Sequence, residues 1–129
     1  MADRAPLLAI VVARIPDDRI LLRALLRIHH IQVEAETEGA AQAARLVRER
    51  NFTHMVVDSE LADGTVPELV AEARSIRADL RVVVLTRPNE RAPDLPNIPG
   101  PPIAYLARPF RFSQFAEALG VRPLSNGSS

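Results

Sequence analysis

The chain has 129 residues, which is enough for one ordinary domain and too few for two independent hydrophobic cores. Hydrophobic residues make up 47% of it and charged residues 25%, the balance of a soluble globular protein, which argues against wholesale disorder. The 16 basic and 16 acidic side chains cancel, so a nucleic-acid partner held mainly by bulk electrostatic attraction is not expected.

Two residue types that many mechanisms need are missing. All 16 basic residues are arginine, so chemistry that requires a lysine Schiff base or a lysine contact to a phosphoryl group is excluded. Cysteine is absent, which excludes disulfides, thiolate zinc sites and thiol nucleophiles. Residues 1–4 lack a signal-peptide pattern, and no apolar run approaches the roughly 20 residues of a membrane span. We therefore expect a cytoplasmic protein without a membrane partner.

The first half of the chain alternates short apolar runs with amphipathic stretches. A continuous run over 7–12 predicts a strand that is covered on both faces. Pro16, Asp17 and Asp18 open a predicted helix over 16–28, because proline fits the first turn and acidic side chains complement the helix dipole. A strand over 31–35, a turn at Glu38-Gly39, a helix over 40–50 and a buried strand over 55–57 follow. This last strand stops at Asp58.

Two side-chain stripes run along the predicted helix over 16–28. The apolar stripe contains Leu21, Leu25 and Ile28, with Leu22 and Leu26 beside it. A separate basic stripe contains Arg19, Arg23 and Arg27, which recur every four residues. The two histidines at 29 and 30 follow at the helix end, where such residues are usually exposed and compensate the helix dipole.

The second half continues the alternation until a proline-rich segment interrupts it. A helix over 67–78 and a strand over 81–85 ending at Thr86 are followed by a strand over 103–106 and then Arg108-Pro109-Phe110. Six of the eleven prolines lie between residues 87 and 102, and each would cost a helix interior about 3 kcal/mol. A regular helix is therefore not expected there, although its position between two strands requires one.

The chain ends with a short helix and a polar tail. Ser113 can cap a helix that runs to Leu119 and is closed by Gly120. We expect one domain over residues 1–122, with a flexible tail over 123–129.

Strands that alternate with helices indicate a parallel sheet covered on both faces. Five strands in this length predict a flavodoxin-like, doubly wound α/β fold with strand order 2-1-3-4-5, in which the fourth helix is broken or replaced by a proline-rich loop. In that order the functional crevice lies at the carboxyl ends of the strands. The residues that the chain delivers to this edge are Ala13, Arg14, Asp58, Thr86 and Arg108.

With these residues in place, the chain resembles the CheY-like receiver domain of two-component response regulators over nearly its whole length. Asp58 matches the phosphoacceptor aspartate, Thr86 and Tyr105 match the switch residues, and Glu38-Gly39 matches the acidic-glycine turn. Arg108-Pro109-Phe110 takes the place of the family's Lys-Pro-Phe, so Arg108 stands for the phosphate-binding lysine.

The departures from the family pattern concern the metal site. Receivers end their first strand with two acidic residues that hold Mg²⁺, whereas Ala13 and Arg14 stand there in this chain. Mg²⁺ requires oxygen ligands, usually including one or two carboxylates, so we expect weak or absent binding and no cofactor. Asp17 and Asp18 lie about one helical turn too far along to substitute. Arg14 and Arg108 are expected to flank Asp58, lower its pKa and hold it in a permanent salt bridge.

The leading functional prediction is therefore a degenerate receiver (pseudo-receiver) that signals through protein–protein contact without aspartyl phosphorylation. Two alternatives stay open: a working phosphoacceptor at Asp58 with unusual metal ligation, for example through Glu60 or Asp17, or the regulatory domain of a longer transcription regulator. FMN binding is rejected, because residues 13–18 supply acids and not a phosphate-binding loop. The sequence contains no recognisable catalytic motif, so we expect no enzymatic activity.

The resemblance implies a signalling partner, such as a histidine kinase, a phosphotransfer protein or an output domain, and leaves room for a homodimer. The proline-rich segment falls on the surface where receivers bind partners, so it predicts an altered choice of partner. The residues that we nominate for partner contact are Arg19, Arg23, Arg27, Tyr105 and Phe112.

Overall fold

The computed structural model describes residues 6–121, which form five strands and four helices. In chain order the elements are β1 (Leu8–Val12), α1 (Pro16–Ile28), β2 (Gln32–Thr37), α2 (Ala40–Glu49), β3 (His54–Asp58), α3 (Val66–Ile76), β4 (Arg81–Thr86), β5 (Ala104–Ala107) and α4 (Phe112–Leu119). Every predicted strand and helix is present. Strand β2 continues two residues further than predicted, to Thr37, because it pairs with the whole length of β1. Helix α3 ends two residues earlier than predicted, at Ile76.

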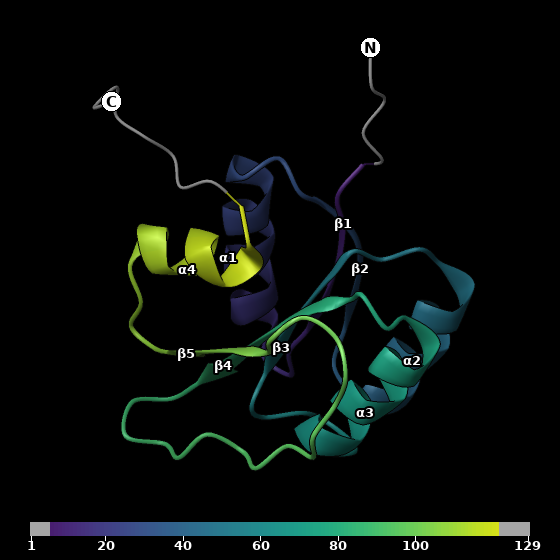
Figure 1. Cartoon of the computed structure of the whole chain (residues 1–129). Helices are drawn as coiled ribbons and strands as arrows, with labels where there is room; N and C mark the ends of the chain where they lie inside the picture. Colours follow the sequence, from purple (N-terminus) through teal and green to yellow (C-terminus); the bar gives the residue numbers. More distant parts are fainter. Residues whose placement is uncertain (1–5, 122–129) are drawn as a thin grey trace.

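The strands form one parallel sheet in the order β2-β1-β3-β4-β5, which confirms the predicted topology. Figure 1 shows α1 and α4 on one side of this sheet and α2 and α3 on the other. The winding reverses between β1 and β3, so the loops that follow these two strands diverge and leave a crevice at the carboxyl edge.

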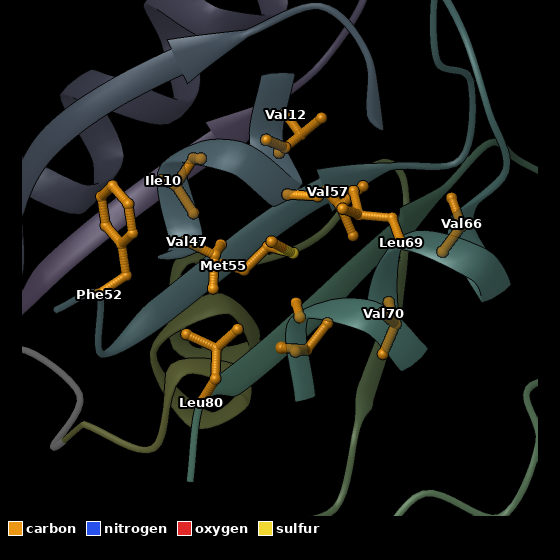
Figure 2. Close-up of a cluster of buried hydrophobic side chains, with 14 of the residues drawn as sticks. Ile10, Val12, Val47, Phe52, Met55, Val57, Val66, Leu69, Val70 and Leu80 are labelled. Carbon is orange, nitrogen blue, oxygen red and sulfur yellow. The ribbon is translucent and has the colours of Figure 1, made fainter. Parts of the chain in front are cut away.

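Each face of the sheet has its own hydrophobic core, because successive strand residues point to opposite faces. Ile10, Val12 and Val57 contribute to the core beneath α2 and α3, which Figure 2 shows, whereas Val11 and Val56 contribute to the core beneath α1 and α4. The central strands are thus buried on both sides. This burial explains why their sequences are continuously apolar and not alternating.

Helix α1 packs on the sheet through a narrower stripe than predicted. Leu22 and Leu26 are buried, whereas Leu21 is 51% and Ile28 is 42% exposed. Apolar residues cover more than one side of this helix, and only the side that faces the sheet can be buried. The side that packs on the sheet is therefore the one with Leu22 and Leu26, and not the stripe that contains Leu21 and Ile28.

The chain around α4 also differs in detail from the prediction. Arg111, and not Ser113, is the N-cap residue, and its backbone N–H donates to Gln114 Oε1 at 2.7 Å. Gly120 closes the helix in the left-handed conformation, as predicted, with φ of 74°. His29 is only 6% exposed and packs against Phe112 and Phe115, so the expected surface position was wrong for this histidine.

No helix or strand is present between Thr86 and Ala104, which agrees with the expectation that prolines exclude a helix there. This segment (green in Figure 1) leaves the end of β4, extends past α3 and returns to β5. The expected tail over 123–129 lies outside the described residues. Among residues 6–121, no helix has the length and apolar character that crossing a membrane requires.

The burial pattern of α1 predicts how two leucines of the same helix differ in their contribution to stability. We expect Leu26→Ala to lower the free energy of unfolding by about 3 kcal/mol, because it leaves a cavity in the core. Leu21→Ala is the matched control and should change it by less than about 0.5 kcal/mol. Urea denaturation measures both; equal losses would contradict the described packing.

Candidate functional site

The predicted crevice residues lie at one edge of the sheet. Asp58 and Thr86 are the last residues of β3 and β4, while Ala13 and Arg108 come directly after β1 and β5. The ladder continues into the loops: Arg108 N donates to Thr86 O at 2.9 Å, and Ala13 N donates to Thr37 O at 2.9 Å. Parallel strands bring these side chains to the same edge because their carboxyl ends all point the same way.

Asp58 is a buried carboxylate with incomplete hydrogen bonding. Its residue is 1% exposed, and its Oδ1 accepts a hydrogen bond from Arg108 Nη2 at 3.2 Å. Its Oδ2 has no hydrogen-bond partner among the described residues, although Arg87 Nη2 lies 3.9 Å away. A buried charge that is only partly paired is costly, so the state of this carboxylate depends on the nearby arginines.

Burial has the largest effect on the ionisation of this group. It raises the pKa of the Asp58 carboxyl above its ordinary value, while Arg108 and then Arg87 act in the opposite direction. The charge of Asp18 adds to the rise. The arginines thus act in the expected direction, but the expectation of a lowered pKa overall was wrong, because desolvation outweighs their attraction.

Arg108 bridges two carboxylates that come from different elements. While its Nη2 binds Asp58, its Nη1 donates to Asp18 Oδ1 at 3.0 Å. Asp18 lies in the first turn of α1, and the long arginine side chain spans the distance between it and Asp58. The expectation that Asp18 is too far along to replace the acidic pair as a metal ligand stays a prediction.

Arg14 does not contact Asp58, contrary to the expectation. Residue 13 is buried and residue 14 is exposed, so the Arg14 guanidinium points to the rim and binds Glu60 Oε2 at 3.1 Å. The second cation near Asp58 is instead Arg87, which also forms an ion pair with Glu60. Sequence reasoning missed Arg87, although its place directly after Thr86 at the carboxyl end of β4 could have indicated it.

Together these contacts form a chain of alternating charges around the buried carboxylate, which we call the crevice ion chain. Its members in order are Arg14, Glu60, Arg87, Asp58, Arg108 and Asp18. It connects the loops after β1, β3, β4 and β5 with the first turn of α1. The three positive and three negative side chains leave no net charge for an additional ion to neutralise.

A second contact fixes the loops on the β3–β4 side of the crevice. Glu90 Oε1 accepts hydrogen bonds from the Ser59 hydroxyl at 2.8 Å and from Arg87 N at 2.7 Å. These hydrogen bonds lower the pKa of the Glu90 carboxyl, so it stays ionised. Glu90 thus connects the loop after β3, which contains Glu60, with the loop after β4, which contains Arg87.

The crevice differs from the resemblance in the residues that would supply oxygen donors to Mg²⁺. Ala13 and Arg14 occupy the positions where the resemblance places two acidic residues, and Asp58 already accepts from Arg108. Within residues 6–121, no three His, Cys, Asp or Glu side chains are grouped so that they could hold a metal ion.

The two switch-equivalent residues differ in burial. Thr86 is 4% exposed beside Asp58, whereas Tyr105 is 42% exposed on the edge strand β5. Partial burial, and then the charge of Asp94, raises the pKa of the Tyr105 phenol. Tyr105 therefore lies close to the proline-rich segment and not in the crevice with Asp58.

The basic stripe of α1 is not a uniform exposed surface. Arg19 donates to the carbonyl of Ala13 at 2.7 Å and to that of Arg14 at 3.1 Å, so it braces the loop after β1. Arg23 pairs with Glu36 at 2.9 Å, and Arg27 is exposed. Of the three arginines that we nominated for partner contact, Arg19 is thus already bound to backbone carbonyls of its own chain.

An apolar groove lies beside the crevice, between α1 and the chain that follows β5. Phe112, which is 44% exposed, forms one wall of this groove. The groove has a volume of about 390 Å³ and is lined by Leu21, Leu22, Leu25, Arg108, Pro109, Phe110 and Phe112. Arg108 thus lines both the groove and the crevice, so a molecule in the groove would contact the ion chain.

Solved structures of receiver domains share this fold. A response regulator receiver protein from Sinorhizobium medicae aligns with a TM-score of 0.76 at 16% identity, covering 88% of this chain and 91% of that one. A CheY-like receiver domain from Methylobacillus flagellatus gives 0.74 at 16% identity, with 90% and 98% covered.

A third similar structure contains a bound magnesium ion. The receiver domain of a sensor histidine kinase from Pseudomonas aeruginosa, with a magnesium ion coordinated in its active-site cleft, gives a TM-score of 0.72 at 18% identity. The alignment covers 89% of this chain and 95% of that domain. Searches of the sequence against protein-family models and curated proteins find no match. The likeness confirms the predicted CheY-like fold.

The burial of Asp58 predicts the direction of its titration. We expect its carboxyl pKa, followed by the ¹³C signal of Asp58 in the full chain, to lie above the ordinary value. Arg108→Met should raise it further, because Arg108 is the largest opposing charge. Since the raised pKa disfavours the ionised form in the folded state, the contribution of Asp58 to stability should fall as the pH rises through this pKa. A pKa at or below the ordinary value would contradict the prediction.

Proposed function

We propose that this protein is an atypical receiver domain of a two-component-type pathway, which signals through protein–protein contact without Mg²⁺-dependent phosphorylation of Asp58. The observation that carries the proposal is the Arg108 guanidinium, which binds Asp58 and Asp18 at once. Arg108 thereby binds the Asp58 carboxylate oxygen that a metal ion would otherwise bind. The receiver fold of the similar structures supports the signalling role.

The chemistry of phosphoryl transfer supports the same conclusion. The transferred group carries charge that a metal ion normally neutralises while it aligns the reacting atoms. The crevice has no acidic pair after β1, and its arginines are engaged with Asp18, Asp58 and Glu60. We propose that Mg²⁺ binds weakly or not at all, that no other cofactor is required and that the protein is not an enzyme.

Contact with a partner fits the surfaces beside the crevice. Exposed Leu21 and Phe112 border the apolar groove, and Arg27 is exposed on the same helix as Leu21. We propose a signalling protein in the cytoplasm as the partner, such as a histidine kinase, a phosphotransfer protein or an output domain of a longer regulator. A second copy of this chain, bound through the same surface to form a homodimer, is a further candidate for the partner.

One observation favours the second candidate, a working phosphoacceptor. Asp58 lies at the end of β3 beside Thr86, and its Oδ2 has no hydrogen-bond partner in the described part of the chain. A free carboxylate oxygen at that place is the atom that a phosphoryl group would modify. The two candidates differ in whether this oxygen reacts.

Incubation of the full chain with Mg²⁺ and acetyl phosphate separates the two. We expect no phosphoryl adduct on Asp58 by intact-mass measurement and no Mg²⁺-dependent binding of beryllofluoride, because the metal donors are missing. The Ala13→Asp/Arg14→Asp variant restores the acidic pair and should bind Mg²⁺ at least about tenfold more tightly. A stoichiometric adduct on Asp58 of the unaltered protein would establish the phosphoacceptor instead.

Removal of the carboxylate tests independence from phosphorylation at the level of partner binding. Once a partner has been isolated from native cytoplasm, we expect Asp58→Asn to bind it within about threefold of the unaltered protein, a difference below about 1 kcal/mol. Leu21→Asp places a charge in the groove wall and should weaken binding at least about tenfold. Loss of binding by Asp58→Asn alone would contradict the proposal.

A further inference from the structure

The sequence between β4 and β5 restricts the conformations open to the backbone of residues 92–99. Pro93, Pro96 and Pro99 recur at every third position. Each proline fixes its own φ at about −65°, and each disfavours the helical region for the residue before it. From residue 92 to residue 99, only Asp94 and Asn97 are neither a proline nor the residue before one. These constraints favour a polyproline II helix, which has about three residues per turn.

The burial of the side chains follows this period in part. Leu95 and Ile98 are half-buried and pack against the core beneath α2 and α3. The neighbours on either side of them are exposed: Asp94, Pro96, Asn97 and Pro99. Two exposed residues separate Leu95 from Ile98, which agrees with three residues per turn and not with the every-second-residue alternation of a β-strand. Pro93 is also half-buried and stands outside this repeat. We call residues 93–99 the proline ridge, and Leu95 and Ile98 form its inward apolar edge.

A buried arginine of α3 holds the end of the proline ridge. Arg74 is 4% exposed; its Nη1 donates to the carbonyl of Pro99 at 2.9 Å and its Nη2 to that of Pro101 at 2.6 Å. Its Nε donates to the carbonyl of Leu80 at 2.6 Å, which fixes the guanidinium itself.

The turn at Gly100 lets the chain approach this arginine. Gly100 has φ of +121°, and a Cβ there would lie 2.5 Å from Arg74 Nη1 and 2.4 Å from the carbonyl oxygen of Ala78. A polyproline II helix has no internal hydrogen bonds. The guanidinium and the inward apolar edge therefore supply the contacts that keep the proline ridge in place.

We propose that the proline ridge is a preformed ligand for a protein module with a groove lined by aromatic side chains. Such grooves bind extended proline-rich segments, because proline rings fit between aromatic rings and the segment is already ordered. Pro96 and Pro99 are exposed at the required spacing of three. Since folding has already fixed the ridge, binding loses less conformational entropy than it would with a free peptide. This contact does not depend on the state of Asp58.

Nuclear magnetic resonance titration of the ¹⁵N-labelled full chain tests the proposal. The probes are one purified SH3, one WW and one EVH1 domain, the three kinds of module known to bind such segments. At probe concentrations up to about 1 mM, we expect at least one to shift the amide signals of Asp94, Leu95, Asn97 and Ile98. No shift of these signals with any of the three would overturn the proposal.

Proline variants show whether the ridge itself is bound. The double variant Pro96→Ala/Pro99→Ala should weaken binding at least about fivefold, because it removes both exposed rings and frees the backbone. Pro88→Ala is the matched control, since Pro88 is an exposed proline in the turn before the ridge. Equal weakening by the control would show that binding does not use the ridge, and the proposal would fail.

A variant of the anchor tests whether the ridge is preformed. Arg74→Lys keeps the positive charge but cannot reach three carbonyls with one planar group. We expect faster amide hydrogen exchange at Asn97 and Ile98 and weaker binding of the probe. Unchanged exchange and binding would contradict a ridge held by Arg74. If this variant does not fold, the proline variants decide the proposal by themselves.

Discussion

The crevice depends on one buried carboxylate and on the arginine that spans from it to a second one. Asp58 is almost fully covered, so it needs a nearby cation, and Arg108 binds it together with Asp18. A guanidinium has separate Nη1 and Nη2 groups in one plane, which lets it hold two carboxylates in a fixed arrangement. A lysine ammonium is a compact point charge on a flexible stem. Compared with a lysine, an arginine at residue 108 therefore keeps the positive charge and also holds Asp58 and Asp18 in a fixed arrangement.

Much of the fold could be predicted because its strands are buried on both faces. Continuous apolar runs such as Ile10–Val12 and Met55–Val57 occur where each successive residue enters a different core. The missing helix between β4 and β5 was also predictable, since proline excludes a helix whatever surrounds it. The carboxyl edge then follows from the topology, which places Asp58, Thr86 and Arg108 near one another.

The pairing of charges could not be predicted in the same way. Sequence indicates where a Cα lies along an element, but a long arginine side chain can reach any of several acids around it. Arg14 thus binds Glu60 and not Asp58, and Asp18 enters the crevice through Arg108. Burial along α1 could not be predicted for a related reason: the helix is apolar on several sides, and the sheet decides which leucines it covers. The balance of desolvation against attraction at Asp58 likewise depends on atomic surroundings.

The position of Tyr105 has a spectroscopic consequence. It is the only tyrosine, and the sequence contains no tryptophan. Its ring is half exposed on β5, near enough to Asp94 for that carboxylate to affect the ionisation of the phenol. The near-ultraviolet absorbance and emission of the whole chain therefore come almost entirely from one chromophore beside the segment that precedes β5. A displacement of that segment would change the signal without any added label.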